Sequence, residues 1–93
     1  MKVLEQTIEM RGIGELTIAT QIKRQGNICL YLRDDDAYEV FIVQTEKSKE
    51  IKGVKFEARE VYPKNEDFGS TAWCYYGRED LANAKFEELV KKG

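Results

Sequence analysis

The segment Arg78–Lys92 near the end of the sequence constrains the fold most strongly, because it predicts a helix with a single apolar stripe. Within Arg78–Lys92, apolar side chains recur at a spacing of three to four residues, which places them on one helical face: Ala82, Phe86, Leu89 and Val90. Leu81 and Ala84 widen this stripe. Acidic residues begin the segment and lysines end it, as the helix dipole favours. The rest of the chain must therefore supply an apolar surface against which this helix packs.

Two central segments predict neighbouring β-strands that could supply that surface. Residues 27–33 alternate between apolar and mixed positions, and Ala37–Gln44 is a second run rich in β-branched and aromatic residues. The aspartates between them, Asp34–Asp36, predict a hairpin turn. Carboxylates also suit calcium or magnesium, but the residue spacing of a calcium-binding loop is absent. We expect the helix to pack on the face of residues 28, 30 and 32 or on that of residues 38, 40 and 42.

The N-terminal region predicts two further strands. Val3–Met10 is the first, and Gly12–Gly14 marks a break after it. From Glu15 to Lys23 apolar and polar residues alternate with a period of two, which predicts a half-buried strand, although a helix also fits.

The region after residue 44 predicts fewer regular elements. Thr45–Gly53 is polar and predicts a solvated loop, and Val54–Ala58 predicts a strand that pairs with Ala37–Gln44 as a meander. Tyr62–Thr71 is irregular, and a short extended segment, Trp73–Tyr76, precedes the helix. The whole chain, residues 1–93, is thus predicted to be one α+β domain. In it, an antiparallel sheet of about four to five strands packs against one C-terminal amphipathic helix.

The composition argues against several classes of protein. The chain has 15 basic and 17 acidic residues and a net charge of -2, which indicates no specific partner. Its longest apolar run is Val40–Val43, far too short to span a membrane, and we see no signal peptide. Two cysteines, Cys29 and Cys74, and no histidine favour a reducing cytoplasm and leave no zinc site or base-activated nucleophile. We expect no enzyme activity, cofactor or metal.

One strand is apolar on both sides, which raises the question of what covers its second face. From Val40 onward both faces of the strand are apolar, whereas one helix covers one face only. Either the N-terminal strand or the Tyr62–Thr71 loop covers the second face, or it is an interface with a second copy or another protein. The aromatic residues of the Tyr62–Tyr76 segment are further interface candidates, although we expect Trp73 to fill the junction between sheet and helix. The candidate partner-binding residues are Tyr31, Phe41, Val43, Phe68 and Tyr75.

A single-stranded nucleic acid is the alternative partner. Tyr31 and Phe41 could stack on bases from one face of a sheet. A lysine-rich stretch could contact phosphates, although Glu46 and Glu50 dilute its charge. The candidate residues are Lys47, Lys49, Lys52 and Lys55.

Three stretches of the chain also resemble a known group of proteins. They are Gln21–Tyr31 with Tyr38–Val43, the run Tyr62-Pro63-Lys64-Asn65-Glu66-Asp67-Phe68-Gly69, and Trp73 followed by the helix that ends in Phe86–Leu89. Together they resemble small uncharacterised proteins of bacteriophages and prophages. The resemblance implies an accessory protein of a mobile element that acts in the host cytoplasm. Proteins of this class bind a host protein and in some cases inhibit it, for example to block a defence system.

Overall fold

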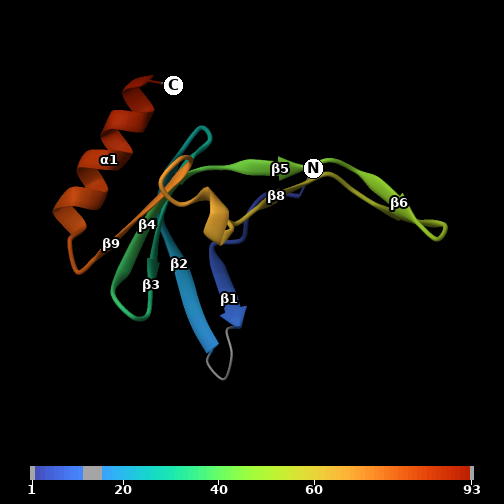
Figure 1. Cartoon of the computed structure of the whole chain (residues 1–93), viewed down its shortest axis with the longest axis horizontal. Coiled ribbons are helices and arrows are strands. Elements are labelled where there is room, and N and C mark those ends of the chain that lie inside the picture. The colour runs from blue at the N-terminus through green and yellow to red at the C-terminus, as the bar shows by residue number, and fades with distance from the viewer. Residues whose placement is uncertain (1, 12–15, 93) are drawn as a thin grey trace.

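The computed structural model describes residues 2–11 and 16–92, and the predicted break at Gly12–Gly14 lies outside these ranges (Figure 1). The described elements are β1 (Thr7–Arg11), β2 (Leu16–Gln25), β3 (Ile28–Arg33), β4 (Ala37–Ile42), β5 (Gln44–Glu46), β6 (Lys49–Ile51), β7 (Val54–Phe56), β8 (Arg59–Val61), the 3₁₀ helix η1 (Asn65–Asp67), β9 (Ala72–Tyr76) and α1 (Glu79–Lys92).

A five-stranded antiparallel sheet of order β1-β2-β3-β4-β9 forms the body of the protein. This sheet and the α-helix confirm the predicted α+β class, and the helical alternative is wrong for Leu16–Lys23, which lies within β2. The aspartates form the β3–β4 turn, where Asp36 has a φ of 64°, a conformation that aspartate tolerates. The predicted pairing of Val54–Ala58 with Ala37–Gln44 is also wrong, because β9 takes that place beside β4. From that place, β9 brings Trp73 and Tyr75 to the cluster under the helix.

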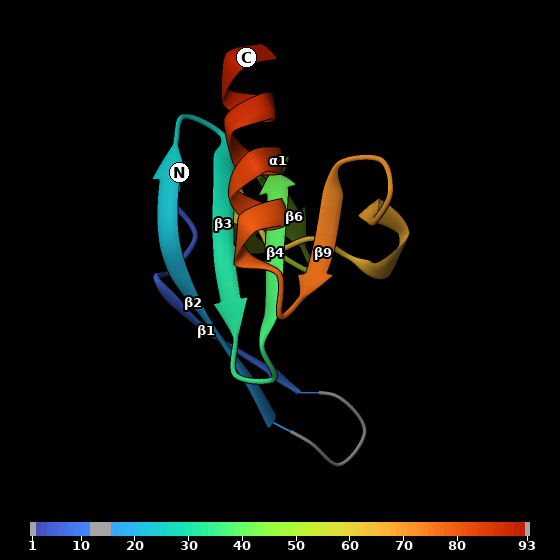
Figure 2. The same ribbon diagram turned by 90° about the vertical axis from the view of Figure 1, so that its left-hand side faces the viewer.

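The helix packs on one face of this sheet, as its apolar stripe predicts (Figure 2). Ala82, Phe86 and Leu89 pack there against apolar side chains of β3 and β4: Ile28, Leu30 and Val40. Burying Phe86 and Leu89 contributes roughly 2–3 kcal/mol each before the loss of entropy is counted. Trp73 packs beside them, and the Lys85 ammonium lies 4.1 Å from the centre of its ring. Leu81 and Ala84 are exposed, so the buried stripe is narrower than predicted.

The opposite face of the sheet is covered by the chain itself. The second apolar face of β4 is therefore buried within the protein and is not an interface. Tyr31 and Phe41 are stacked there, with ring centres 5.5 Å apart, and neither has any exposed surface. The ring of Tyr62 packs edge-on against both. The other residues that complete this cover come from the N-terminal segment and the loop before β9: Leu4, Ile8, Met10 and Phe68.

A buried carboxylate fixes Tyr62 in this cover. Glu39 is only 3% exposed and accepts a hydrogen bond of 2.5 Å from the Tyr62 hydroxyl. Arg33 lies farther away, with its Nη1 atom 3.9 Å from the carboxylate. Burial raises the pKa of Glu39 above its ordinary value, while the hydroxyl and the guanidinium oppose that rise.

An irregularity in β2 allows the N-terminal strand to reach this face. The pairing of β2 with β3 shifts between Gln21 and Lys23, and a bulge of this kind bends a strand. Before the shift, Ile8 pairs with Ala19, and both pack on the covered face. Because side chains alternate along a strand, the opposite row of β2 lies on the helix side of the sheet. We call this row, with Leu32 of β3 beside it, the β2 stripe: Leu16, Ile18, Thr20 and Leu32.

Candidate functional site

A two-stranded ribbon between β4 and η1 projects away from the sheet on the side opposite to α1 (Figure 1). β5 pairs with β8 at its base, and β6 pairs with β7 at its tip. We call residues 44–61 the ribbon arm and residues 47–56 the arm tip. The prediction of a solvated loop at Thr45–Gly53 is wrong, because most of that segment is one side of this ribbon.

The turn at the end of the arm explains why these polar residues form a hairpin. Ile51 pairs with Val54, which leaves only Lys52 and Gly53 as the connection. Their φ angles are 50° and 82°, the positive values that a tight two-residue hairpin turn requires. Glycine adopts such a value without strain, and the twist of this turn matches that of the two strands.

The arm tip has one apolar face. Ile51 pairs with Val54 and Lys49 pairs with Phe56, so these four side chains lie on the same side of the ribbon. Ile51, Val54 and Phe56 are 49%, 55% and 48% exposed. Glu50 and Lys55 form the cross-strand pair of the other, polar face. Three large apolar side chains thus form one contiguous exposed face, in contrast to the scattered apolar residues of ordinary surfaces.

The arm tip is also positively charged. It has four lysines and a single acidic residue, Glu50, although the chain as a whole carries a net charge of -2. Among the described residues, no carboxylate lies within 4.0 Å of any of these lysine ammonium groups. The tip therefore presents unpaired positive charge around its apolar face, which would attract an acidic partner.

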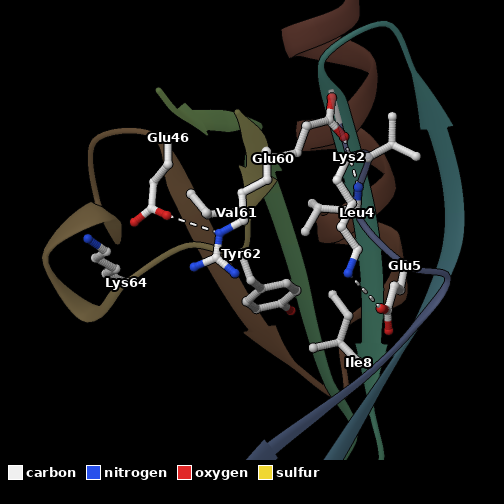
Figure 3. Close-up of a pocket in the computed structure, with 11 residues that line it drawn as sticks. Lys2, Leu4, Glu5, Ile8, Glu46, Glu60, Val61, Tyr62 and Lys64 are labelled. Carbon is white, nitrogen blue, oxygen red and sulfur yellow. Dashed lines mark hydrogen bonds and ion pairs between the residues drawn. The ribbon is translucent and has the colours of Figure 1, made fainter. Parts of the chain in front are cut away.

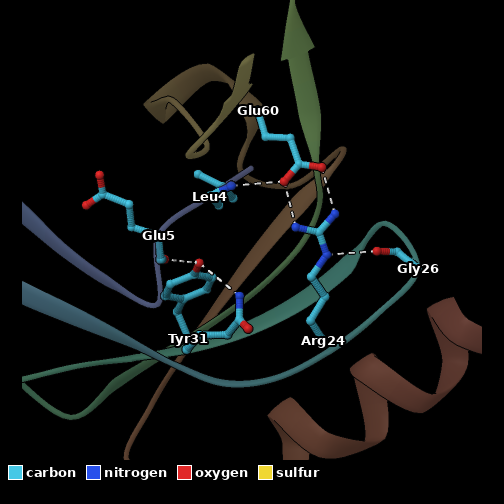
Figure 4. Close-up of polar contacts among 7 residues, drawn as sticks. Leu4, Glu5, Arg24, Gly26, Tyr31 and Glu60 are labelled. Atoms are coloured by element: carbon cyan, nitrogen blue, oxygen red, sulfur yellow. Dashed lines mark hydrogen bonds and ion pairs between the residues drawn. The ribbon is translucent and has the colours of Figure 1, made fainter. Parts of the chain in front are cut away.

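The base of the arm is clamped to the body by one ion pair (Figure 4). Arg24 donates two hydrogen bonds to the Glu60 carboxylate, from Nη1 at 2.6 Å and from Nη2 at 2.7 Å. The backbone N–H of Leu4 donates a third, at 3.0 Å. The Arg24 guanidinium lowers the pKa of Glu60 to about 2, since its hydrogen bonds favour the ionised carboxylate.

The N-terminal segment runs beside the arm and adds to this clamp. The Lys2 N–H donates to the Ala58 carbonyl, and the Glu60 N–H donates to the Lys2 carbonyl. Lys2 also borders two hollows. One, of about 410 Å³, lies at the base of the arm beside Leu4 and Tyr62 (Figure 3). The other, of about 380 Å³, is lined by Ile51 and Phe56, so the apolar face of the tip opens into a groove.

The residues predicted to bind a partner do not gather at one site. Tyr31, Phe41 and Val43 are buried in the core, which corrects their assignment to an open surface and removes Tyr31 and Phe41 as platforms for bases. Phe68 and Tyr75 are half-buried and belong to opposite faces of the sheet. The predicted lysines do lie together on the arm tip: Lys47, Lys49, Lys52 and Lys55.

Sequence reasoning missed the three residues that form the apolar face of the arm. The signal was present in Val54–Phe56, where apolar and charged residues alternate directly after Lys52-Gly53, and in Ile51 just before that pair. The abundance of lysine and glutamate concealed it, because a charged segment resembles a loop when its period of two is not examined.

Other kinds of site find little support among the described residues. No group of three or more histidine, cysteine or acidic side chains in residues 2–11 and 16–92 is arranged to hold a metal ion. In the same ranges no helix has the length and apolar character that crossing a membrane requires. Cys29 and Cys74 are both free thiols, and burial raises the pKa of Cys29 to about 11, which disfavours its reactive thiolate.

Comparisons with known proteins add no family to these observations. No protein-family model matches the chain, and neither the curated proteins nor the solved structures include a significant match.

Proposed function

We propose that this protein is a non-enzymatic binding module that contacts a protein partner through the ribbon arm. The observation that carries the proposal is the apolar face of the arm tip, where Ile51, Val54 and Phe56 are each about half exposed. Covering this face would remove apolar surface from water, which is the main favourable contribution to most protein association.

The limited attachment of the arm tip to the body also favours binding to a partner. An isolated two-stranded ribbon is only marginally stable in water. Among the described residues, the tip of this ribbon joins the body through β5, β8 and the N-terminal segment. A partner that covered the apolar face would order the tip and gain a rigid contact. The turn at Lys52-Gly53 sets the twist of the ribbon in advance, which lowers the entropy that binding costs.

The resemblance to small phage proteins suggests the setting of this interaction. A mobile-element accessory protein in the host cytoplasm would use the arm to bind a host protein and, where the arm covers a functional surface, to inhibit it.

A pull-down with two matched variants tests the proposal. The wild-type chain, an arm variant (Ile51→Ser with Val54→Ser and Phe56→Ser) and a control (Leu81→Ser) would be immobilised and exposed to lysate of the encoding organism or its host. Leu81 is also exposed, but it lies on α1 and outside the arm. We expect a protein that the wild type and the control retain and the arm variant loses. A captured set that is the same for all three baits, or empty for all, would contradict the proposal.

Nucleic acid remains a second candidate for one reason, the excess of lysine on the arm tip. A two-stranded β-ribbon fits the major groove of DNA, and lysines can contact phosphates from it. This binding should weaken steeply with salt, because each phosphate contact releases counterions. Fluorescence anisotropy with labelled single- and double-stranded oligonucleotides at two salt concentrations would measure it. The absence of binding at low salt would dismiss this candidate.

A further inference from the structure

The β2 stripe is a second apolar surface that the chain leaves uncovered. α1 packs on β3, β4 and β9, and Lys23 in the second half of β2 reaches it, with its ammonium 4.5 Å from the centre of the Phe86 ring. The first half of β2 lies to one side of the helix, next to β3 (Figure 2). Leu16 is 50% exposed, Thr20 is exposed, and Ile18 and Leu32 are half-buried. The stripe thus combines aliphatic side chains with a strand that is paired on both sides, with β1 and with β3.

Acidic residues border one end of this stripe. The Asp34 carboxylate accepts a hydrogen bond of 3.2 Å from the Ile18 N–H, and the Asp34 N–H donates to the Ile18 carbonyl. Asp35 and Asp36 follow in the same turn, and all three aspartates are exposed. Arg33 pairs with Asp35, so the turn keeps two aspartates whose charge no salt bridge in the described residues offsets.

The arm tip and the β2 stripe are complementary in charge, chemistry and size. The tip carries lysines around an apolar face, and the stripe carries aspartates beside one. The paired strands of the tip are about 7 Å long from Lys49 to Ile51 and fit within the stripe, which is about 13 Å long from Leu16 to Thr20, at the usual rise per residue of a strand. The arm projects from the side of the sheet opposite to α1, whereas the stripe lies on the helix side, so one chain cannot dock its arm on its own stripe (Figure 1).

We propose that the occupant of the β2 stripe is the arm tip of a second copy of this chain. This inference rests on the proposed function, because it assigns a partner to the same apolar face of the arm. Since arm and stripe are different surfaces, the contact is heterologous: two chains close a symmetric dimer only if both arms dock reciprocally, and otherwise the chains form longer assemblies.

Complementation between two monomeric variants tests this arrangement. Variant A, Lys47→Glu with Lys49→Glu, reverses charge on the arm tip. Variant B, Thr20→Arg with Asp35→Lys, makes the stripe repel a basic arm. All four positions are exposed, so both variants should fold, which circular dichroism would verify. A variant with Lys91→Glu and Lys92→Glu is the control, because it carries the same charge change as A at the exposed end of α1.

Sedimentation analysis would follow the mass of each chain up to about 1 mM, a concentration that reveals weak contacts. We expect the wild type and the control to self-associate, and raising the salt from about 0.05 to about 0.5 M to weaken that association roughly tenfold. We expect A and B to remain monomeric alone and to associate when mixed. A monomeric wild type would overturn the proposal, and so would a B variant that self-associates like the wild type, because the arm would then bind elsewhere.

The same variants separate this inference from the proposed function. If B still captures the lysate protein that the wild type captures, but the wild type does not self-associate, the inference fails and the proposed function stands. If the arm variant with three serines captures and self-associates as the wild type does, both fail.

Discussion

The ion pair between Arg24 and Glu60 yields the sharpest prediction, because a single substitution removes its charge and almost nothing else. Glu60→Gln keeps the shape of the side chain but replaces a carboxylate that accepts three hydrogen bonds, two from Arg24 and one from the Leu4 N–H. Both partners are largely buried, with 22% of the Arg24 side chain and 8% of the Glu60 side chain exposed. The substitution would leave the guanidinium without its counter-charge.

The pKa of Glu60 sets the size of this effect and its dependence on pH. The carboxylate has a pKa of about 2 in the folded protein against an ordinary value of 4.5. At about 1.4 kcal/mol per pH unit, and allowing for screening of the partly exposed arginine, the ionised form stabilises the fold by about 2 kcal/mol. Because the folded pKa is the lower one, this contribution is complete well above pH 4.5 and is lost as the pH falls from 4.5 towards 2.

Urea unfolding of the wild type and Glu60→Gln between pH 7 and pH 3 would measure the difference. We expect a loss of about 2 kcal/mol in the free energy of unfolding at pH 7, and a smaller loss at pH 3. Hydrogen exchange of the Leu4 amide should also accelerate, since that amide loses its acceptor. The matched control is Glu46→Gln, whose partner Arg59 is exposed, and it should change stability much less. A difference that is independent of pH would refute the reasoning.

Three further predictions concern the body of the fold. Phe86→Ala should lower the free energy of unfolding by about 3–4 kcal/mol in urea titrations because it leaves a cavity under the helix, and an equal loss from Leu81→Ala would contradict this packing. Tyr62→Phe should cost about 1–3 kcal/mol in the same assay, since the buried Glu39 carboxylate loses its hydroxyl donor; an unchanged midpoint would show that another group satisfies it. Cys29 should react with a thiol reagent at pH 8 only after unfolding, and rapid modification of the native protein would contradict its burial.

The elements with strong periodicity were predictable from the sequence. The apolar stripe of α1 identifies the side of the helix that faces the core, because burial imposes the period. The composition of β3 and β4 identifies two strands, and the apolar residues on both sides of β4 indicate that both of its faces are covered. The position of Trp73 at the junction of sheet and helix follows from its place just before the helix, and the structure confirms it.

The pairing of the shorter strands was not predictable in the same way. Val54–Phe56 has the alternation of a strand, but alternation alone does not show which strand it pairs with. The two-residue turn at Lys52-Gly53 makes it pair with Lys49–Ile51 instead of β4. The cover over Tyr31 and Phe41 depends on contacts between the N-terminal segment and residues near Tyr62, which are far apart in the chain. No local sequence pattern reports such contacts. The sequence therefore predicted a partner surface on the sheet face, whereas the structure exposes an apolar face on the arm instead.

The link between Lys2 and the segment around Glu60 has a consequence for how the chain folds as it is synthesised. The segment around Lys2 emerges before its partners and cannot take its final place until nearly sixty more residues have followed, because those partners are Ala58 and Glu60. Until then the hairpin of β3 and β4 exists without its N-terminal cover, and the rings of Tyr31 and Phe41 face water. Closing so long a loop is slow compared with forming a hairpin. The nascent chain thus passes through a stage in which this apolar face of the sheet is open, and a chaperone would bind there.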